Sequence, residues 1–216
     1  MSSITHHIPD ELLIAYASGS LEQAFSLVLA AHISMCDECR ARLGAHEAVG
    51  GAMLENACGT EVGVAVSADL KARLLDALDD PVEPAPPAYH RSGVFPGPVM
   101  EALGGLPPKW KPLGMGVRQS ILSHGKGGSV RLLYIPSGQA VPDHGHNGLE
   151  LTLVLQGAFH DETGRFGVGD VEIADSDLEH TPVAEEGAAC ICLAATDAAL
   201  RFRSFIPRLL QPVFRI

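Results

Sequence analysis

The sequence lacks features on which several large classes of protein depend. It has 15 lysines and arginines against 26 acidic residues, a net charge of −11 at neutral pH, and only 5% of its residues are aromatic. This composition argues against a DNA or RNA partner and against an anionic membrane surface, because both are bound through basic side chains. We therefore expect no direct contact with nucleic acid or with a membrane.

The chain also shows neither a signal peptide nor a membrane span. Its first residues, MSSITHHIPDELL, contain no basic region followed by an apolar core, and the longest apolar run, around residues 25–33, is too short to cross a bilayer. We therefore expect a cytoplasmic protein, in which the five cysteines act as thiols or metal ligands rather than structural disulfides. Cys190 and Cys192 alternate along one predicted strand and are expected to be buried small side chains.

What the sequence does contain is enough apolar residues, 46%, for a globular core, and an uneven distribution of charge. Residues 1–80 hold 12 acidic and 4 basic side chains, a net charge of −8, whereas residues 81–216 hold 14 and 11, a net charge of −3. The acidic first part suits a basic protein partner. An acidic surface retained for solubility explains the charge equally well.

Residues 1–80 have the pattern of four helices. Pro9 and Asp10 begin the first and Gly19 ends it. Ser20 is expected to cap the second, which has apolar residues at helical spacing from residue 21 to residue 33. The third should run from about residue 38 to residue 58. Ser67 should cap the fourth, which ends near residue 80 because a proline-rich stretch follows.

A set of metal-binding residue types lies between the second and third of these helices. His32 and Cys36 are one helical turn apart, and Cys36 and Cys39 have the spacing that lets two thiolates bind one ion. These three donors favour zinc, which needs a fourth ligand for a closed tetrahedral site. His6 and His7 both lie before the first helix and could supply it. We choose His7, the one nearer the helix.

This His-x3-Cys-x2-Cys pattern in a short, acidic, helical segment resembles the zinc-binding anti-sigma domain. The resemblance implies that an upstream histidine completes the zinc site. It also implies that the helices bind an alternative sigma factor of the extracytoplasmic-function type and keep it from core RNA polymerase. A structural zinc would contribute folding energy that so small a helical domain lacks.

The remainder of the chain has the pattern of a β domain. Prolines at 81, 84, 86, 87, 96 and 98 predict an extended linker, which we assign to residues 86–100, between a helical domain of residues 1–85 and a second domain of residues 101–216. In the second domain, short apolar or alternating segments separated by glycine-containing turns predict a sandwich or barrel. They are residues 114–122, 129–135, 149–155, 158–161, 170–174, 189–195 and 200–205.

A second set of metal-binding residue types lies in this β domain. His144 and His146 are two residues apart, so a strand would direct both to one face, and Glu150 opens the next apolar segment. Two imidazoles and a carboxylate form most of a metal site. With Gly138 before them and Gly157 after them, these residues match the first motif of the cupin superfamily.

The cupin resemblance implies a small double-sheet barrel with a metal inside and a fourth ligand from a second motif. Here that motif begins at Gly169 and places His180 in register, while Asp175, Asp177 and Ala184 replace the usual proline, glycine and asparagine. The predicted fold is therefore α+β, with a small zinc-bound helical bundle followed by an all-β cupin barrel. Zinc, manganese and iron all tolerate three histidines and one carboxylate.

The two domains together, including EHTPVAE around His180 and the closing QPVFRI, resemble the ChrR-type anti-sigma family. This resemblance implies a 1:1 complex with a sigma factor, which is released when the metal-binding cupin domain senses an oxidative signal, singlet oxygen or a hydroperoxide. The alternative is a cupin metalloenzyme, a dioxygenase or hydrolase that carries a helical regulatory or dimerisation domain. The Cys/His cluster favours the regulator, because an enzyme has no use for it.

Overall fold

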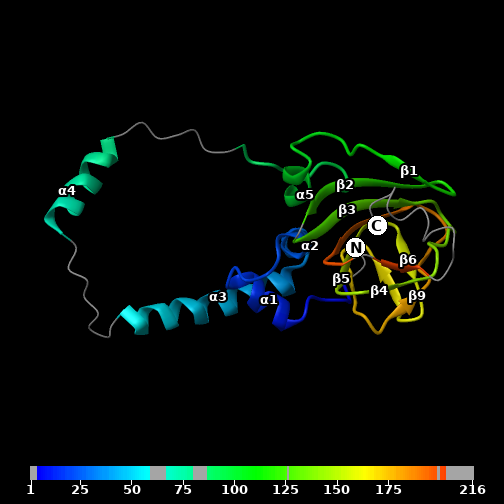
Figure 1. The fold of residues 1–216 in the computed structure, drawn as a ribbon, viewed down its shortest axis with the longest axis horizontal. Coiled ribbons are helices and arrows are strands. Elements are labelled where there is room, and N and C mark those ends of the chain that lie inside the picture. Colours follow the sequence, from blue (N-terminus) through cyan, green and yellow to red (C-terminus); the bar gives the residue numbers. More distant parts are fainter. Residues whose placement is uncertain (1–3, 59–66, 80–86, 126, 199, 203–216) are drawn as a thin grey trace.

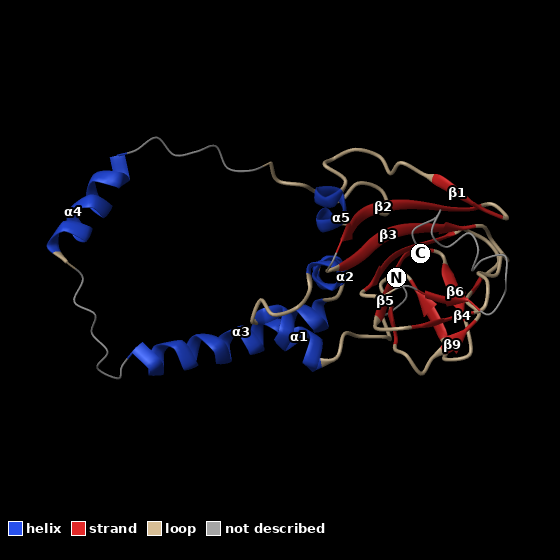
Figure 2. Cartoon of the chain, in the orientation of Figure 1, coloured by secondary structure: helices blue, strands red, loops and turns tan. Residues whose placement is uncertain are grey.

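The computed structural model describes residues 4–58, 67–79, 87–125, 127–198 and 200–202, with helices on one side of the molecule and strands on the other (Figure 2). The predicted closing segment QPVFRI lies outside these residues. The helices are α1 (Asp10–Ala17), α2 (Gln23–Ile33), α3 (Asp37–Cys58), α4 (Ala68–Asp76), the short 3-10 helix η1 (Ala77–Asp79) and α5 (Gly97–Ala102).

The strands form three antiparallel sheets. The largest has the order β1-β2-β3-β11-β5-β8, and two three-stranded sheets have the orders β10-β6-β7 and β12-β4-β9. Their bounds are β1 Lys111–Gly114, β2 Val117–Gly125, β3 Gly128–Ile135, β4 His144–His146, β5 Glu150–Gln156, β6 Ala158–His160, β7 Arg165–Gly167, β8 Val171–Ala174, β9 Glu179–His180, β10 Val183–Ala184, β11 Cys190–Thr196 and β12 Leu200–Phe202.

All four predicted helices are present, but the expected cap of the second is wrong. The backbone N–H and the hydroxyl of Ser20 both donate to the carbonyl of Ala15, so Ser20 closes α1, and α2 begins three residues later. Gly19 allows this closure because its φ of 70° is one that glycine adopts readily. The cap of α4 is confirmed, since the Ser67 hydroxyl accepts the N–H of Leu70 at 3.1 Å.

The helices do not form one four-membered bundle. Helices α1, α2 and α3 pack together beside the sheets, whereas α4 lies far from them and from every strand (Figure 1).

The linker is shorter than predicted. Helix α5 begins at Gly97 with Pro98 in its first turn, and Val99 and Met100 are buried beside α2. No helix among the described residues combines the length and apolar character that a bilayer crossing needs.

The large sheet has two covered faces because its side chains alternate. Leu151, Leu153 and Leu155 of β5 join α1–α3 in one apolar core, together with Leu132 of β3 and Leu193 of β11. Val154 of β5 instead packs with Phe159, Phe166, Cys190 and Cys192 in a second core on the opposite face. Strands β5 and β11 are therefore buried on both sides. The helical part and the β part share their main hydrophobic core.

Most of the predicted strands are present, with three differences. Residues 115–116 form a turn between β1 and β2, so the segment predicted at 114–122 is not one continuous strand. The segment predicted at 200–205 is described only as far as residue 202. The predicted barrel is not closed, since no ladder among the described strands joins the large sheet to the two smaller ones. Pro136 and Pro142, which lie between β3 and β4, cannot donate ladder hydrogen bonds.

Candidate metal centres

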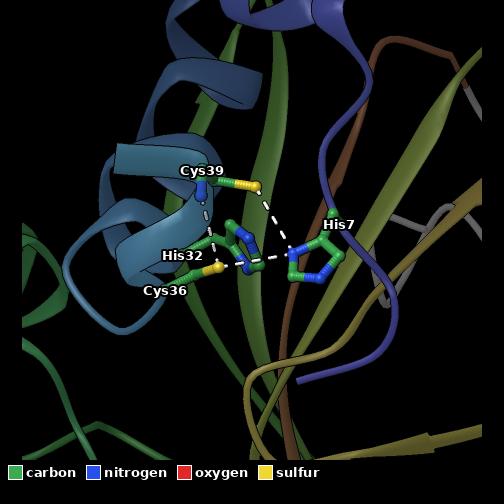
Figure 3. A group of neighbouring side chains, drawn as sticks. All are labelled: His7, His32, Cys36 and Cys39. Atoms are coloured by element: carbon green, nitrogen blue, oxygen red, sulfur yellow. Dashed lines mark hydrogen bonds between the residues drawn. The ribbon is translucent and has the colours of Figure 1, made fainter. Parts of the chain in front are cut away.

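The first centre brings together all four side chains predicted for it. His7 precedes α1, His32 lies in the last turn of α2, Cys36 lies between α2 and α3, and Cys39 lies in the first turn of α3 (Figure 3). One potential ligand atom from each lies within 4.8 Å of those of the other three, and three of the four residues are buried. The spacing alone could bring the three later residues together, but only the fold brings His7 to them.

The distances in this group match those around one tetrahedral ion. The Nδ1 atom of His7 lies 3.4 Å from Cys36 Sγ and 3.6 Å from Cys39 Sγ. A nitrogen and a sulfur bound to the same zinc ion, at roughly 2.0 and 2.3 Å and at the tetrahedral angle, would be separated by about 3.5 Å. The backbone N–H of Cys39 also points to Cys36 Sγ at 3.5 Å, which stabilises a thiolate at that position.

The second nitrogen of each histidine is held by another group. The Nδ1–H of His32 donates to the carbonyl of Gly169 at 2.9 Å, and His7 Nε2 lies 3.3 Å from a Glu38 carboxylate oxygen. His32 Nε2 is buried, and no described residue offers it a hydrogen bond, as expected for a ligand atom directed at a cation. Burial lowers the pKa of His32 to about 4, so its imidazole is neutral at physiological pH, as a ligand must be.

The neighbouring histidine, His6, has a different environment. Its ring lies against Phe166 with centroids 4.4 Å apart, and its Nδ1 is 3.6 Å from the carboxylate of Asp170. It therefore faces the β part of the molecule and is not in the four-residue group.

Burial raises the pKa of the Cys39 thiol to about 11, so a cation that binds there has to displace a proton.

The second centre contains the three histidines predicted for it. His144 and His180 are directly opposite one another in the β4–β9 ladder, and His146 follows His144 on the same face of β4. Their ligand atoms lie within 4.8 Å of one another and all three are buried. The Nε2 atoms of His146 and His180 are 3.2 Å apart, within the range of about 3.0–3.4 Å for two nitrogens on one cation.

Glu150 lies beside this group rather than within it. Its Oε2 is 3.6 Å from His146 Nδ1, and its Oε1 accepts a hydrogen bond from the Thr152 hydroxyl at 3.0 Å. The carboxylate is buried on the face of β5 that also carries Thr152. Burial lowers the pKa of His144, and the nearby charge of Glu150 partly offsets that decrease. Three imidazoles and one nearby carboxylate are donors that fit a divalent cation.

Two carboxylates that sequence reasoning missed hold His180. Its Nδ1–H donates to Asp161 at 2.6 Å and to Glu172 at 3.1 Å, which directs Nε2 towards the other histidines. Burial alone would lower the pKa of His180, but these carboxylates raise it to about 9, while burial raises the pKa of Glu172 to about 8. The sequence did contain a signal for Glu172, because it is an acidic residue at a buried position within the otherwise apolar strand β8.

The remaining cysteine pair was predicted to be buried on one face of a strand, and that prediction is confirmed. Cys190 and Cys192 are both buried in β11, with Sγ atoms 3.4 Å apart. The hydrogen bond with the Cys190 thiol, together with burial, raises the pKa of Cys192, which keeps it protonated. Neither belongs to a metal-binding group among the described residues.

Comparison with known proteins connects both halves to one group of regulators. Residues 107–199 match the family model described as the ChrR cupin-like domain. The chain is 56% identical over 216 residues to the anti-sigma-E factor ChrR of Cereibacter sphaeroides, covering 99% of this chain and 100% of that protein. It is also similar to a chain in the crystal structure of Rhodobacter sphaeroides SigE in complex with the anti-sigma ChrR. That similarity has a TM-score of 0.77 and 55% identity, and it covers 90% of this chain and 100% of that one.

Proposed function

Because the chain belongs to the ChrR family of anti-sigma factors, we propose that it binds an extracytoplasmic-function sigma factor in a 1:1 complex and releases it on an oxidative signal. The signal we propose is singlet oxygen or an organic hydroperoxide, sensed through the cupin domain. A sigma factor acts on RNA polymerase, so we expect the complex to form in the cytoplasm. The chain is an anti-sigma factor and not an enzyme, which removes the dioxygenase or hydrolase alternative.

Exposed apolar surface on two helices is the observation that supports sigma-factor binding. The second half of α3 and the α4–η1 segment carry large apolar side chains that are 41–76% exposed. They are Val49, Met53 and Leu54 in α3, Leu70, Leu74 and Leu75 in α4, and Leu78 in the adjoining η1. Each helix thus carries its own group of exposed apolar side chains, and such groups mark interaction sites, because a free chain gains nothing by exposing them. The acidic charge of residues 1–80 adds attraction for a basic partner.

We propose zinc for the first centre and zinc, manganese or iron for the second. Two cysteines and two histidines at tetrahedral distances form a closed site, in which zinc would fix the N-terminal segment to α2 and α3. Three histidines and Glu150 would leave coordination positions open at the second centre. That difference supports a structural role for the first ion and a sensing role for the second.

The experiment is titration of the metal-loaded chain with the purified cognate sigma factor, measured by fluorescence anisotropy. Replacing Leu74 and Leu78 by glutamate should weaken binding by at least tenfold, because charges then occupy an apolar interface. Leu106→Glu is the matched control, since Leu106 is 58% exposed, like Leu74 at 59%, but lies after α5. Equal affinity for the double variant and the control would overturn the proposed docking surface.

A further inference from the structure

One four-residue segment, Gly169–Glu172, contacts both candidate metal centres. It follows β7 and includes the first two residues of β8. Its first residues contact the N-terminal part of the chain, and its last residue contacts a histidine of the cupin centre. The segment is described throughout, and Gly169 is the glycine that opens the second cupin motif.

At the first centre, the segment bonds His32 directly and also bonds the chain immediately before His7. The Gly169 carbonyl accepts the Nδ1–H of His32 at 2.9 Å. The Asp170 carboxylate accepts the backbone N–H groups of Thr5 at 2.7 Å and His6 at 2.9 Å, and Val171 N–H donates to the His6 carbonyl at 3.2 Å. The residue immediately before His7 is therefore attached to the start of β8.

The fit at this contact is close. The Asp170 side chain is only 6% exposed, and its carboxylate also accepts the N–H of Gly167 at 2.8 Å and the Thr5 hydroxyl at 3.3 Å. Gly169 has a φ of 94°, and a Cβ added there would lie 2.6 Å from the Ile4 side chain. A contact this tight transmits a displacement instead of absorbing it.

At the second centre, the segment holds one ligand. Glu172 lies opposite Thr152 in the β5–β8 ladder, so its side chain points to the face that also carries Glu150. Its carboxyl Oε1 lies 3.1 Å from His180 Nδ1. Only Val171 separates Glu172 from Asp170, a span of about 7 Å along an extended strand.

We propose that Gly169–Glu172 positions ligands of both metal centres and couples them, so that the state of the cupin centre sets how tightly the N-terminal centre retains its ion. Asp170 and Glu172 are the positioning residues, and neither is assigned as a metal ligand. The proposal rests on the two centres of the proposed function holding metal. A loosened His180 would shift Glu172 and, through β8, the support of His7 and His32. Coupling of this kind is reciprocal, so each ion should also strengthen retention of the other.

The first test measures metal retention by the full-length chain with cobalt(II) as the probe. Charge-transfer absorption from thiolate to cobalt arises only at the centre that contains cysteines, so it reports that centre separately. Asp170→Ala should weaken retention against a competing chelator by about 10–100-fold, as loss of a supporting group does. Asp175→Ala is the matched control, because Asp175 accepts the N–H of Asp177 at 2.9 Å in the turn after β8. Metal retention in the milder Asp170→Asn variant should be intermediate between that of Asp170→Ala and that of the control.

The second test asks whether the cupin centre is coupled to the first. Glu172→Gln, and separately stripping the cupin centre in a His144→Ala variant, should each accelerate loss of the thiolate–cobalt band by at least threefold while circular dichroism is unchanged. Adding Asp170→Ala to Glu172→Gln should then give less than the product of the single effects, because both act through one segment. Retention within twofold of wild type in Asp170→Ala or in Glu172→Gln would overturn the proposal. The assay contains no sigma factor, so its failure is distinct from failure of the proposed sigma-factor binding.

Discussion

Replacing Val28 by alanine should destabilise the β sheets as well as the helices. Val28 is fully buried in α2, one turn from both Ala24 and His32. Ala24 packs against β3, where a Cβ added to Gly128 would lie 3.1 Å from its methyl group, and His32 donates to Gly169. Val28 therefore lies between two points at which α2 contacts the β part, one at strand β3 and one at the turn before β8.

The expected loss follows from the buried area and the cavity that remains. Removing two buried methyl groups costs about 1.6 kcal/mol of transfer free energy, and the cavity brings the total to about 2–3 kcal/mol. With a urea slope of about 2 kcal/mol/M, the midpoint should fall by about 1–1.5 M.

Fluorescence of Trp110, the only tryptophan, provides the assay. Trp110 precedes β1, packs against the shared core and lies edge-on to Tyr134 with centroids 6.0 Å apart. Val49→Ala is the matched control, because Val49 is 60% exposed on α3 and its truncation should change stability by less than about 0.5 kcal/mol. A Trp110 transition that does not move in Val28→Ala, while the helical circular-dichroism signal does, would refute a shared core.

Three further predictions concern the metal centres. Cys39→Ser should reduce bound metal from two equivalents to one by elemental analysis and abolish sigma-factor binding, and two retained equivalents would contradict the first centre. With the first centre kept loaded with zinc, His144→Ala should leave the affinity for sigma factor within twofold but slow its release under singlet oxygen. An unchanged release rate would show that this centre does not sense the signal. Because the folded-state pKa of His32 is about 4 against about 6.5 when unfolded, the unfolded chain binds the extra proton between these values. The free energy of unfolding of the metal-stripped protein should therefore fall by about 3 kcal/mol as the pH falls from 6.5 to 4. A urea midpoint that stays constant over that range would contradict the lowered pKa of His32.

The sequence by itself determined the features that depend on short separations along the chain. His144 and His146 share a strand face because successive side chains alternate, and Cys36 and Cys39 converge because they are one turn apart. The N-terminal cap of α4 and the glycine closure of α1 were also local, since each depends on hydrogen bonds within a few residues. The cupin resemblance supplied His180, which no local spacing would have connected to His144.

Only the tertiary structure decided how the two parts are joined. The hydrogen bond between His32 and Gly169 links residues 137 positions apart, and Asp170 binds the backbone of Thr5, 165 positions earlier. Such contacts leave no periodic signal, because they depend on where α2 lies on the sheet and not on neighbouring residues. The same holds for Asp161 and Glu172, whose role appears only when β8 and the β6–β7 turn meet His180. The identities of the ligand residues could thus be predicted from short sequence patterns. The groups that hydrogen-bond to these ligands come from distant segments, which pack together because hydrophobic burial does not depend on sequence separation.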